Sequence, residues 1–279
     1  MSILEYFQLD SGRNAIIVGA LISLCCAILG VTLVLKRYSM IGDGLSHVAF
    51  GAMTIAMVLT IADMYLMLPI TILVAILLIR LTDKGRVKND SAIAMLSVGA
   101  LAFGYLLINL FSSSVKVSTD VCTTLFGEMS ILTLSNLDVW LCIGLTIFVL
   151  AFFIIFHNKI FAVTFDSDFT KASGVKTAVY NNIMAIIIGI VIVLAMKLVG
   201  SLLISALIVF PALSTIRLFK SYKRVIIFSS IIGVVNSILG ILIAVLWDTP
   251  VGATIVVVDI FVYAICWLLD IAMRNFKKG

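Results

Sequence analysis

The sequence predicts an all-α, polytopic membrane protein: a single helical bundle of about eight or nine transmembrane helices within residues 1–279. Three observations predict this class. Hydrophobic residues make up 63% of the chain and charged residues only 12%, whereas a soluble domain is about half apolar and about a quarter charged. The mean hydropathy is +1.26. The apolar residues also form long runs, and about 20 apolar residues are enough for a helix to cross a bilayer.

Nine apolar runs lie between charged or turn-rich breaks, and each predicts a transmembrane helix. The runs cover residues 14–35, 44–61, 65–81, 91–111, 134–156, 178–196, 199–216, 225–247 and 252–273. The count falls to eight if one short run is re-entrant, and the pair 44–61 and 65–81 is the least certain. The first run follows a polar stretch and not a basic one, so no cleavable signal peptide is expected. We expect one transmembrane domain and no separate soluble domain.

Lys and Arg residues divide unequally between the two sides that nine spans define. If the N-terminus is external, sixteen of the 19 Lys and Arg residues face the cytoplasm and three face outside. Cytoplasmic loops are enriched in Lys and Arg, so the sequence predicts a plasma-membrane protein with its N-terminus outside and its C-terminus in the cytoplasm. The net charge of +5 is interpreted as topology, and no nucleic-acid partner is expected. The five cysteines form no CxxC pattern and are interpreted as small buried hydrophobic residues.

The segment SMIGDGLSHVAF, residues 39–50, places an aspartate and a histidine four residues apart in this apolar chain. If both are helical, Asp43 and His47 share one face. Ionisable groups inside a membrane usually face a bundle interior or an aqueous cavity, and a carboxylate with an imidazole can bind a divalent metal such as zinc or manganese. The competing interpretation is that Asp43 is a helix N-cap and His47 an interfacial polar residue.

Two ligands hold an ion weakly, which suits a conduit, because conduction needs release as well as binding. The simple topology places Asp43 near the cytoplasmic end of its helix. A site in the middle of the membrane requires the 36–47 segment to fold inward or the preceding helix to tilt. A two-fold axis beside this helix would add a second Asp43 and His47 from a partner chain, and four such ligands can complete a tetrahedral zinc site.

A polar break on the side expected to be cytoplasmic reads VTFDSDFTKASGVKT, residues 163–177. Asp166 can cap a short helix that runs through Phe169 and Ala172, and Gly174 is a natural C-terminal stop. Such a helix, with Phe169 exposed, offers a docking surface for another protein. The alternative is an ordinary loop helix.

The segment AMKLVGSLLISALIVFPALSTIRLFKS, residues 195–221, combines small residues with a proline in an apolar run. Small residues such as Gly200 and Ser205 allow close helix packing in lipid, and Pro211 predicts a kink that lines a cavity. Packing alone also explains these residues. Lys197 lies at the outer end and is expected to snorkel to the interface.

The segment WDTPVGATIVVVDIF, residues 247–261, begins with an external turn at Asp248, Pro250 and Gly252. Asp259 lies deep in the apolar run that follows and must find a partner. A hydrogen bond between helices is favoured over a transport role for this carboxylate. Because no GxxxxGK[ST] phosphate loop is present, the chain is not expected to hydrolyse ATP, and the absence of HExxH and GxSxG motifs disfavours a membrane-embedded enzyme.

Taken in order, these four segments resemble those of the membrane permeases of zinc, manganese and iron ABC importers, the ABC-3 family. RYSMIGDGLSHVAFG is similar to the family's R-x-S-x-x-G-D-x-L-[AS]-H segment, and GVK closes its cytoplasmic coupling segment. MKLVGSLLISALIVFPALSTIR is similar to V-G-x-L-L-[IV]-x-[AS]-L-L-I-x-P-A-A-T-A-R, and DTPVGATIVV to D-x-P-x-G-x-x-[IV]-V. Leu213 and Ser214 replace the usual Ala-Thr, and no family role is carried onto Asp259. The match covers nearly the whole chain.

The resemblance implies a permease that forms a homodimer and pairs with two copies of a cytoplasmic ABC ATPase, which supplies the ATP hydrolysis. It also implies an extracytoplasmic metal-binding protein that delivers the ion. No permanently bound cofactor is expected, because the divalent zinc, manganese or iron ion is the cargo. The resemblance places Asp43 and His47 in the metal pathway or its gate, and the coupling segment at about residues 164–177.

The alternative function is an ion- or proton-coupled secondary transporter in which Asp43, His47 and Asp259 form a proton relay. Such transporters often contain internal inverted repeats, and we find no such repeat in the sequence. Asp and His ligands suit zinc, manganese and iron alike, and import over export rests on the resemblance alone.

Overall fold

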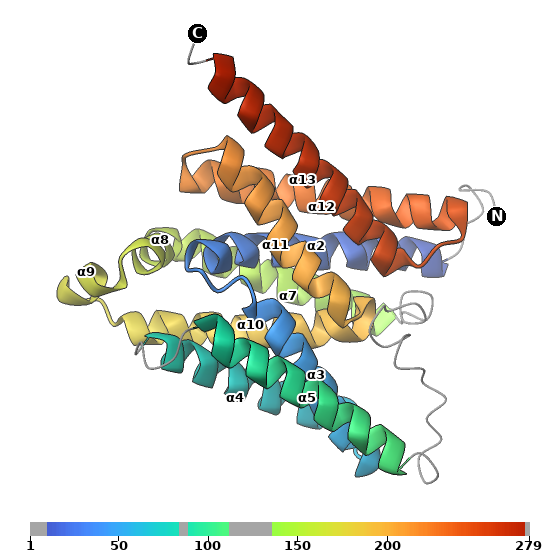
Figure 1. Cartoon of the computed structure of the whole chain (residues 1–279). Helices are drawn as coiled ribbons and strands as arrows, with labels where there is room; N and C mark the ends of the chain where they lie inside the picture. Colours follow the sequence, from blue (N-terminus) through green and yellow to red (C-terminus); the bar gives the residue numbers. More distant parts are fainter. Residues whose placement is uncertain (1–9, 84–88, 112–135, 277–279) are drawn as a thin grey trace.

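The computed structural model describes residues 10–83, 89–111 and 136–276 (Figure 1). Within these ranges every regular element is an α-helix, which confirms the predicted class. The long helices are α2 (Asp10–Leu35), α3 (Ile41–Val58), α4 (Asp63–Asp83), α5 (Asn89–Phe111), α7 (Asn136–Ile155), α10 (Thr177–Val199), α11 (Ser201–Leu218), α12 (Tyr222–Trp247) and α13 (Val251–Phe276). Two short helices, α8 (His157–Phe165) and α9 (Ser167–Ala172), follow α7.

The long helices match the predicted spans. In the described part of the chain, eight helices are long and apolar enough to cross a membrane. The ninth long helix, α11, contains the shorter apolar stretch Leu203–Leu218. About eight or nine transmembrane helices are therefore confirmed. α3 starts three residues before the predicted 44–61 run, and α4 extends past the 65–81 run at both ends.

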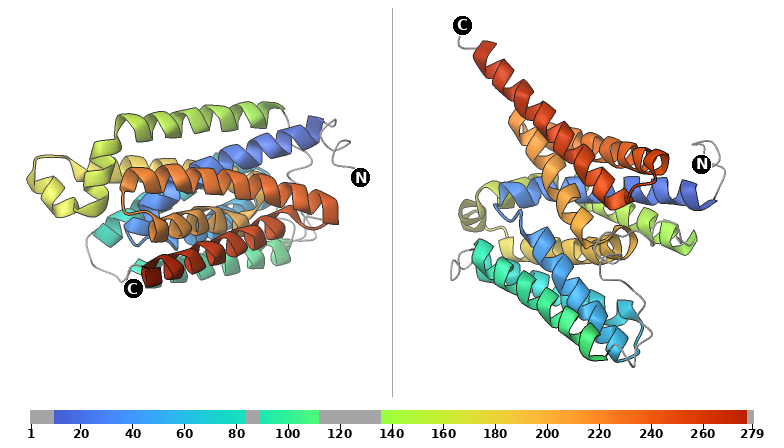
Figure 2. Two further views of the ribbon diagram at one scale, coloured as in Figure 1. Left: turned by 90° about the horizontal axis from the view of Figure 1, so that it is seen from above. Right: turned by 45° about the vertical axis from the view of Figure 1, so that its right-hand side comes forward.

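The helices form two groups that α11 joins (Figures 1 and 2). In one group α3 packs against α4 and α5, and in the other α12 packs against α2 and α13. α11 contacts members of both groups, namely α2, α3, α12 and α13. α2 is the central element, since 72% of its spanning residues are buried, against 17% for α5. α2 begins at one end of the bundle and α13 ends at the other (Figure 1).

Glycines bring the backbones of neighbouring helices close together. A Cβ atom at Gly30 of α2 would overlap the carbonyl oxygen of Ile208 on α11. A Cβ atom at Gly240 of α12 would lie 2.7 Å from the Cα atom of Ile255 on α13. In lipid, apolar burial provides little drive for helices to associate, so close packing at small residues contributes much of their contact energy.

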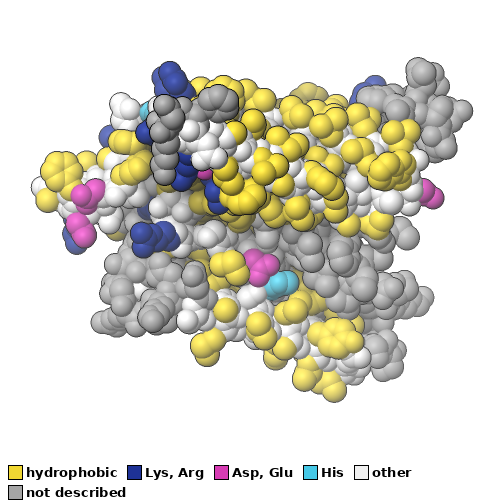
Figure 3. Space-filling model, turned by 45° about the horizontal axis from the view of Figure 1, so that its top comes forward, with side chains coloured by type: hydrophobic (Ala, Val, Ile, Leu, Met, Phe, Trp, Pro, Cys, Tyr) yellow, Lys and Arg dark blue, Asp and Glu magenta, His cyan; other side chains and the backbone are white. Residues whose placement is uncertain are grey.

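The outer surface is suited to lipid. Figure 3 shows hydrophobic side chains over much of the visible face, while Lys and Arg gather mainly toward the end where α8 and α9 lie. Large apolar side chains such as Met95, Trp140 and Ile154 are more than two-thirds exposed. An apolar patch of this extent is unusual on a soluble monomer. The described cysteines are free and buried, as expected, and Cys122 lies outside the described residues.

Candidate metal-pathway site

The end of α2 directs the chain back into the bundle. The N–H of Tyr38 donates to the carbonyl of Leu33 at 2.8 Å, and the N–H of Arg37 donates to the carbonyl of Val34 at 3.0 Å. This is the pattern of a Schellman motif, in which the residue after the cap is left-handed and is usually glycine. Arg37 takes that position with φ 62°. The linker then runs inward before α3 begins at Ile41 (Figure 1).

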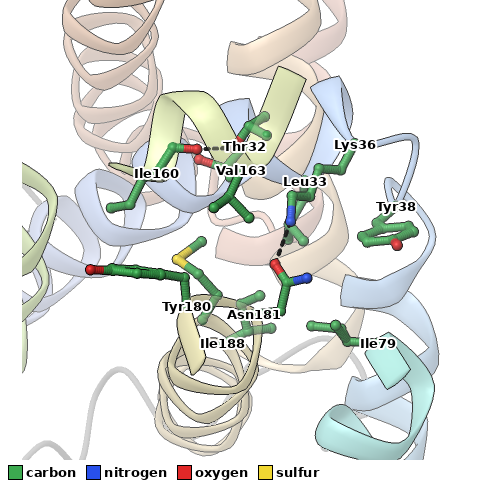
Figure 4. A pocket seen from close by; sticks show the side chains of 12 residues that line it. Thr32, Leu33, Lys36, Tyr38, Ile79, Ile160, Val163, Tyr180, Asn181 and Ile188 are labelled. Atoms are coloured by element: carbon green, nitrogen blue, oxygen red, sulfur yellow. Dashed lines mark hydrogen bonds between the residues drawn. The ribbon is translucent and has the colours of Figure 1, made fainter. Parts of the chain in front are cut away.

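A hydrogen bond fastens this linker to α10. Lys36, directly after α2, donates from Nζ to Oδ1 of Asn181 at 2.6 Å. Figure 4 shows the two side chains pointing toward each other beside Thr32, Tyr38 and Tyr180. The cavity that they line holds only about 20 Å³, so the contact fixes the linker and leaves little room for a ligand.

Asp43 lies in the first turn of α3 and is not its N-cap. Met40 is the N-cap residue, and no side chain caps this terminus. The interpretation of Asp43 as an N-cap is therefore wrong, because the helix starts three residues earlier than the apolar run. A carboxylate in the first turn is stabilised by the positive end of the helix dipole.

The two glycines beside Asp43 let α3 approach two other helices. A Cβ atom at Gly42 would lie 2.9 Å from Cδ1 of Ile208 on α11, and one at Gly44 would lie 2.6 Å from Cγ2 of Ile93 on α5. Neither neighbour leaves room for a larger residue without moving. The sequence Gly-Asp-Gly thus places the carboxylate where α3, α5 and α11 meet.

Asp43 is surrounded by polar groups from three helices. Its Oδ1 lies 3.6 Å from Nε2 of His47, one turn along α3. Ser205 of α11 donates from Oγ to Oδ1 at 3.4 Å, and Ser97 of α5 donates from Oγ to Oδ2 at 3.4 Å. O–H···O hydrogen bonds are usually near 2.7–2.8 Å, so these contacts are long. The carboxylate is held loosely and can accept another ligand.

The pair is accessible from outside the chain. The side chain of Asp43 is 38% exposed and that of His47 is 18% exposed. The Nδ1 atom of His47 is buried and has no hydrogen-bond partner among the described residues. One ring nitrogen therefore faces the carboxylate while the other is enclosed by protein. Within the described ranges, no group of three or more His, Cys, Asp or Glu residues could hold a metal ion.

The site lies away from the ends of α5 at Asn89 and of α11 at Leu218. Ser97 is eight residues from the start of α5 at Asn89, and Ser205 is thirteen residues from the end of α11 at Leu218. At 1.5 Å per residue these separations are about 12 Å and about 20 Å along the two helices. Asp43 is near the end of its own helix, as expected, but that helix begins inside the bundle. The inward course of the linker agrees with a folded-in 36–47 segment, and the depth of the pair in a membrane stays a prediction.

The predicted residues of α10 and α11 separate into different environments. Ser205 contacts Asp43. Gly200 joins the two helices with φ 90°, a conformation that glycine adopts readily. Pro211 is buried inside α11 and packs beside Gly233 of α12. Ser205 is therefore the member of this set that lies at the polar site. The side chain of Lys197 lies outside the described residues.

Helix α9 forms as the sequence predicts. The Asp166 carboxylate accepts a hydrogen bond from the N–H of Phe169 at 2.8 Å and so caps the helix. Gly174, with φ 86°, follows the C-terminal cap at Ser173. The side chain of Phe169 is 70% exposed and Ala172 is also exposed. α8 and α9 project beyond one end of the bundle (Figure 2), so this apolar surface is open to a partner.

Asp259 belongs to a separate interaction. Nδ2 of Asn236 on α12 donates to Oδ1 of Asp259 on α13 at 2.7 Å, and both residues are buried. This is the favoured helix–helix hydrogen bond. The sequence did not single out Ser97, since a serine in an apolar run carries no signal of the carboxylate that it will face. Asn181 was also missed, because nothing in the local sequence shows that its side chain will accept a hydrogen bond from Lys36.

These features first define a class: a multi-pass helical membrane protein whose bundle contains a carboxylate–imidazole pair. The model of the ABC 3 transport family matches residues 8–270. The chain therefore belongs to the ABC 3 transport family, which confirms the resemblance seen in its four segments.

Named relatives cover nearly the whole chain. It is 29% identical over 266 residues to the manganese import system permease protein ScaB of Streptococcus gordonii, a match that covers 95% of this chain and 94% of that protein. It is 27% identical over 269 residues to the manganese transport system membrane protein MntC of Halalkalibacterium halodurans, with 96% and 89% covered. The solved structure of PsaBC from Streptococcus pneumoniae in complex with Fab matches with a TM-score of 0.82 at 27% identity, over 95% of each chain.

Proposed function

We propose that the chain is the permease subunit of an ATP-binding cassette importer that conducts a divalent transition-metal ion into the cytoplasm. The observation that carries the proposal is the accessible Asp43–His47 pair between three helices of an ABC 3 family member. Its relatives ScaB and MntC are named as manganese proteins. Carboxylate and imidazole ligands without thiolate suit manganese as well as zinc and iron, so manganese is the first candidate cargo.

A second copy of the chain completes the proposed site. Asp43 and His47 supply two ligands, and the 38% exposed side of Asp43 is available to ligands from beyond the chain. Homo-oligomers usually form closed two-fold dimers, in which the same patch faces itself. An axis beside α3 would bring two carboxylates and two imidazoles together. Such a site binds an ion while both copies face each other and weakens when they separate.

The proposed importer needs partners that supply energy and cargo. A cytoplasmic ABC ATPase is proposed to dock on α9, where the exposed Phe169 side chain offers an apolar contact at the end rich in Lys and Arg (Figure 3). An extracytoplasmic metal-binding protein is proposed to deliver the ion at the opposite end. This arrangement places the N-terminus outside and the C-terminus in the cytoplasm.

Isotope uptake tests the proposed cargo and energy source together. Cells that express the chain with its companion ATPase and binding protein are expected to accumulate radioactive manganese. Unlabelled manganese should compete better than zinc or iron. Cells that express the chain without the ATPase should accumulate none, whereas uptake that persists without the ATPase and follows the proton gradient would support the secondary-transporter alternative.

Coupling through α9 is tested by Phe169→Asp, with Phe169→Leu as the matched control. The charged variant should retain normal membrane levels but lose the ATPase during purification, and its uptake should fall to the level of cells without the chain. Leucine keeps an apolar contact, so Phe169→Leu should keep both metal uptake and co-purification of the ATPase. Normal uptake and ATPase co-purification in Phe169→Asp would rule out this docking surface.

Orientation is tested by cysteine labelling in a background without the native cysteines. A cysteine at Ser11 should react with a membrane-impermeant thiol reagent in intact cells. A cysteine at Ser221, an exposed position just before α12, should react only after the cells are opened. The reverse pattern would invert the topology and move α9 to the outer face.

A further inference from the structure

A groove of about 630 Å³ lies away from the Asp43 site, between α7 and α12, with α2 beneath it. Figure 2 shows these helices side by side in the left view. All residues that line the groove come from α2, α7, α8 and α12, whereas the residues around Asp43 lie on α3, α5 and α11. The groove is therefore a separate feature, and nothing proposed for it depends on metal transport.

The walls of the groove are apolar and face outward. Ile154 and Ile155 of α7 are 74% and 71% exposed, and Ile227 and Ile231 of α12 are each 51% exposed. The one hydroxyl in the wall is Ser230, which donates to the carbonyl of Ile226 at 2.8 Å within its own helix. The wall thus offers no unsatisfied polar group to a ligand and suits an acyl chain.

One end of the groove is cationic. Lys223, His157 and Asn158 line it there, and none of the lining residues is acidic. The ion pairs between described residues do not include Lys223. Along α12 the lining runs from Lys223 to Ile231, a distance of about 12 Å. A single groove therefore joins a positively charged mouth to an apolar interior.

Two helix N-termini add to the positive potential at this mouth. α8 begins at His157 and α12 at Tyr222, and neither terminus has a side-chain cap. Free N–H groups and the positive end of the helix dipole favour anions. These termini reinforce Lys223, which is the formal charge at the site.

We propose that this groove binds an anionic phospholipid, with the phosphate at Lys223 and one acyl chain between α7 and α12. Lipid tails surround the groove already, so the tail gains little by moving into it. The headgroup contact therefore determines which lipid is held. A second copy of the chain is a poor occupant, because a two-fold axis beside the mouth would bring Lys223 near the partner's equivalent lysine and like charges would repel.

Native mass spectrometry of the purified transporter measures this preference directly. The delipidated protein is titrated with phosphatidylglycerol and with phosphatidylcholine that carries the same acyl chains. Phosphatidylglycerol should bind more tightly. Lys223→Gln should weaken phosphatidylglycerol binding about fivefold, since one cationic residue near a surface contributes roughly that factor for an anionic lipid, and should leave phosphatidylcholine binding unchanged.

Two further variants separate the groove from general surface charge. Lys220→Gln removes an exposed lysine three residues away that does not line the groove, and it should leave both lipids unaffected. Ser230→Phe fills the apolar part of the groove and should weaken the binding of both lipids. Glycerophosphoglycerol, the headgroup without tails, should not compete.

Four results would overturn the proposal. Equal binding of the two lipids by the unmodified protein would show that the charge at the mouth selects nothing. Equal losses in Lys220→Gln and Lys223→Gln would show a diffuse surface effect. Competition by the free headgroup, or a co-purified protein that excludes lipid from this face, would show that the apolar groove holds no acyl chain.

Discussion

Asp43 and Asp259 are both carboxylates within helices of an apolar chain, but their surroundings differ. Asp43 has a 38% exposed side chain and contacts at 3.4–3.6 Å from groups on three helices. Asp259 is fully buried and accepts one short hydrogen bond of 2.7 Å from Asn236. The first carboxylate is accessible and loosely held, whereas the second is enclosed and paired with Asn236 through one of its two oxygens.

Glycines explain how one chain builds both environments. At the second site, Gly240 lies one turn from Asn236 on α12, and Ile255 lies one turn from Asp259 on α13. The contact between Gly240 and Ile255 brings the two backbones together, so the amide reaches the carboxylate directly. At the first site, Gly42 and Gly44 bring α3 close to α11 and α5, but the serines there meet Asp43 only at long range. The two carboxylates thus differ in access: Asp43 is open to a further ligand, whereas Asp259 is enclosed, and its Oδ2 atom has no hydrogen-bond partner among the described residues.

The largest expected effect follows from replacing each carboxylate by its amide. Asp43→Asn removes the charge that we propose attracts the cation, and manganese uptake should fall to the level of cells without the chain. His47→Ala, which removes the second ligand, should behave similarly. Asp259→Asn retains an oxygen acceptor for Asn236 and should keep uptake near normal.

Membrane levels of all three variants are measured in parallel, so that loss of transport is separated from loss of protein. Normal uptake in both Asp43→Asn and His47→Ala would reduce the pair to structural polar residues. Complete loss in Asp259→Asn at a normal protein level would instead support a relay that includes Asp259.

A smaller effect, on stability, is expected at the second site. Asp259→Leu leaves the buried amide of Asn236 without its partner and should destabilise the protein by about 1–3 kcal/mol. Replacing both residues by leucine removes the unsatisfied group and should recover much of the loss. Thermal unfolding in detergent measures Asp259→Leu, Asn236→Leu and the double variant. If the double variant is as unstable as the sum of the single variants, the two side chains do not stabilise the bundle as a pair.

Local signals in the sequence were enough to predict some elements of the structure. Helix α9 begins at its Asp166 cap and ends before Gly174 because capping depends on residues within a few positions of each other. The long helices follow from runs of apolar residues. The start of α3 was predicted three residues late, because Gly42 and Asp43 are weak helix formers and their helical conformation is stabilised by packing against α11 and α5.

The composition of the site depends on contacts between distant segments. The Asp43–His47 pair is visible in the sequence because its two members are one helical turn apart. Ser97 and Ser205 lie 54 and 162 positions from Asp43, and nothing local distinguishes them from other serines in apolar runs. The depth of the site also depends on how the linker at Lys36 is fastened to α10, which is a tertiary contact.

The smallest expected effect comes from adding a methyl group at either glycine that flanks Asp43, and the two substitutions should differ. A methyl group at Gly42 meets Cδ1 of Ile208 at 2.9 Å, the end of a flexible side chain that can turn aside. A methyl group at Gly44 meets Cγ2 of Ile93 at 2.6 Å, an atom attached to Cβ that moves only if α5 shifts or if χ1 changes, and isoleucine in a helix has one strongly preferred χ1 rotamer. Alanine favours a helix over glycine by about 1 kcal/mol, which helps to offset the smaller clash.

Gly42→Ala should therefore keep nearly normal uptake, while Gly44→Ala should lower it several-fold by separating Asp43 from Ser97. The double variant Gly44→Ala with Ile93→Ala removes the obstructing atom and should recover part of the lost uptake, which distinguishes a steric cause from a general effect of alanine. Manganese uptake at matched protein levels measures all three. Equal losses at Gly42 and Gly44, or no recovery in the double variant, would mean that the spacing between α3 and α5 does not determine how Asp43 meets the ion.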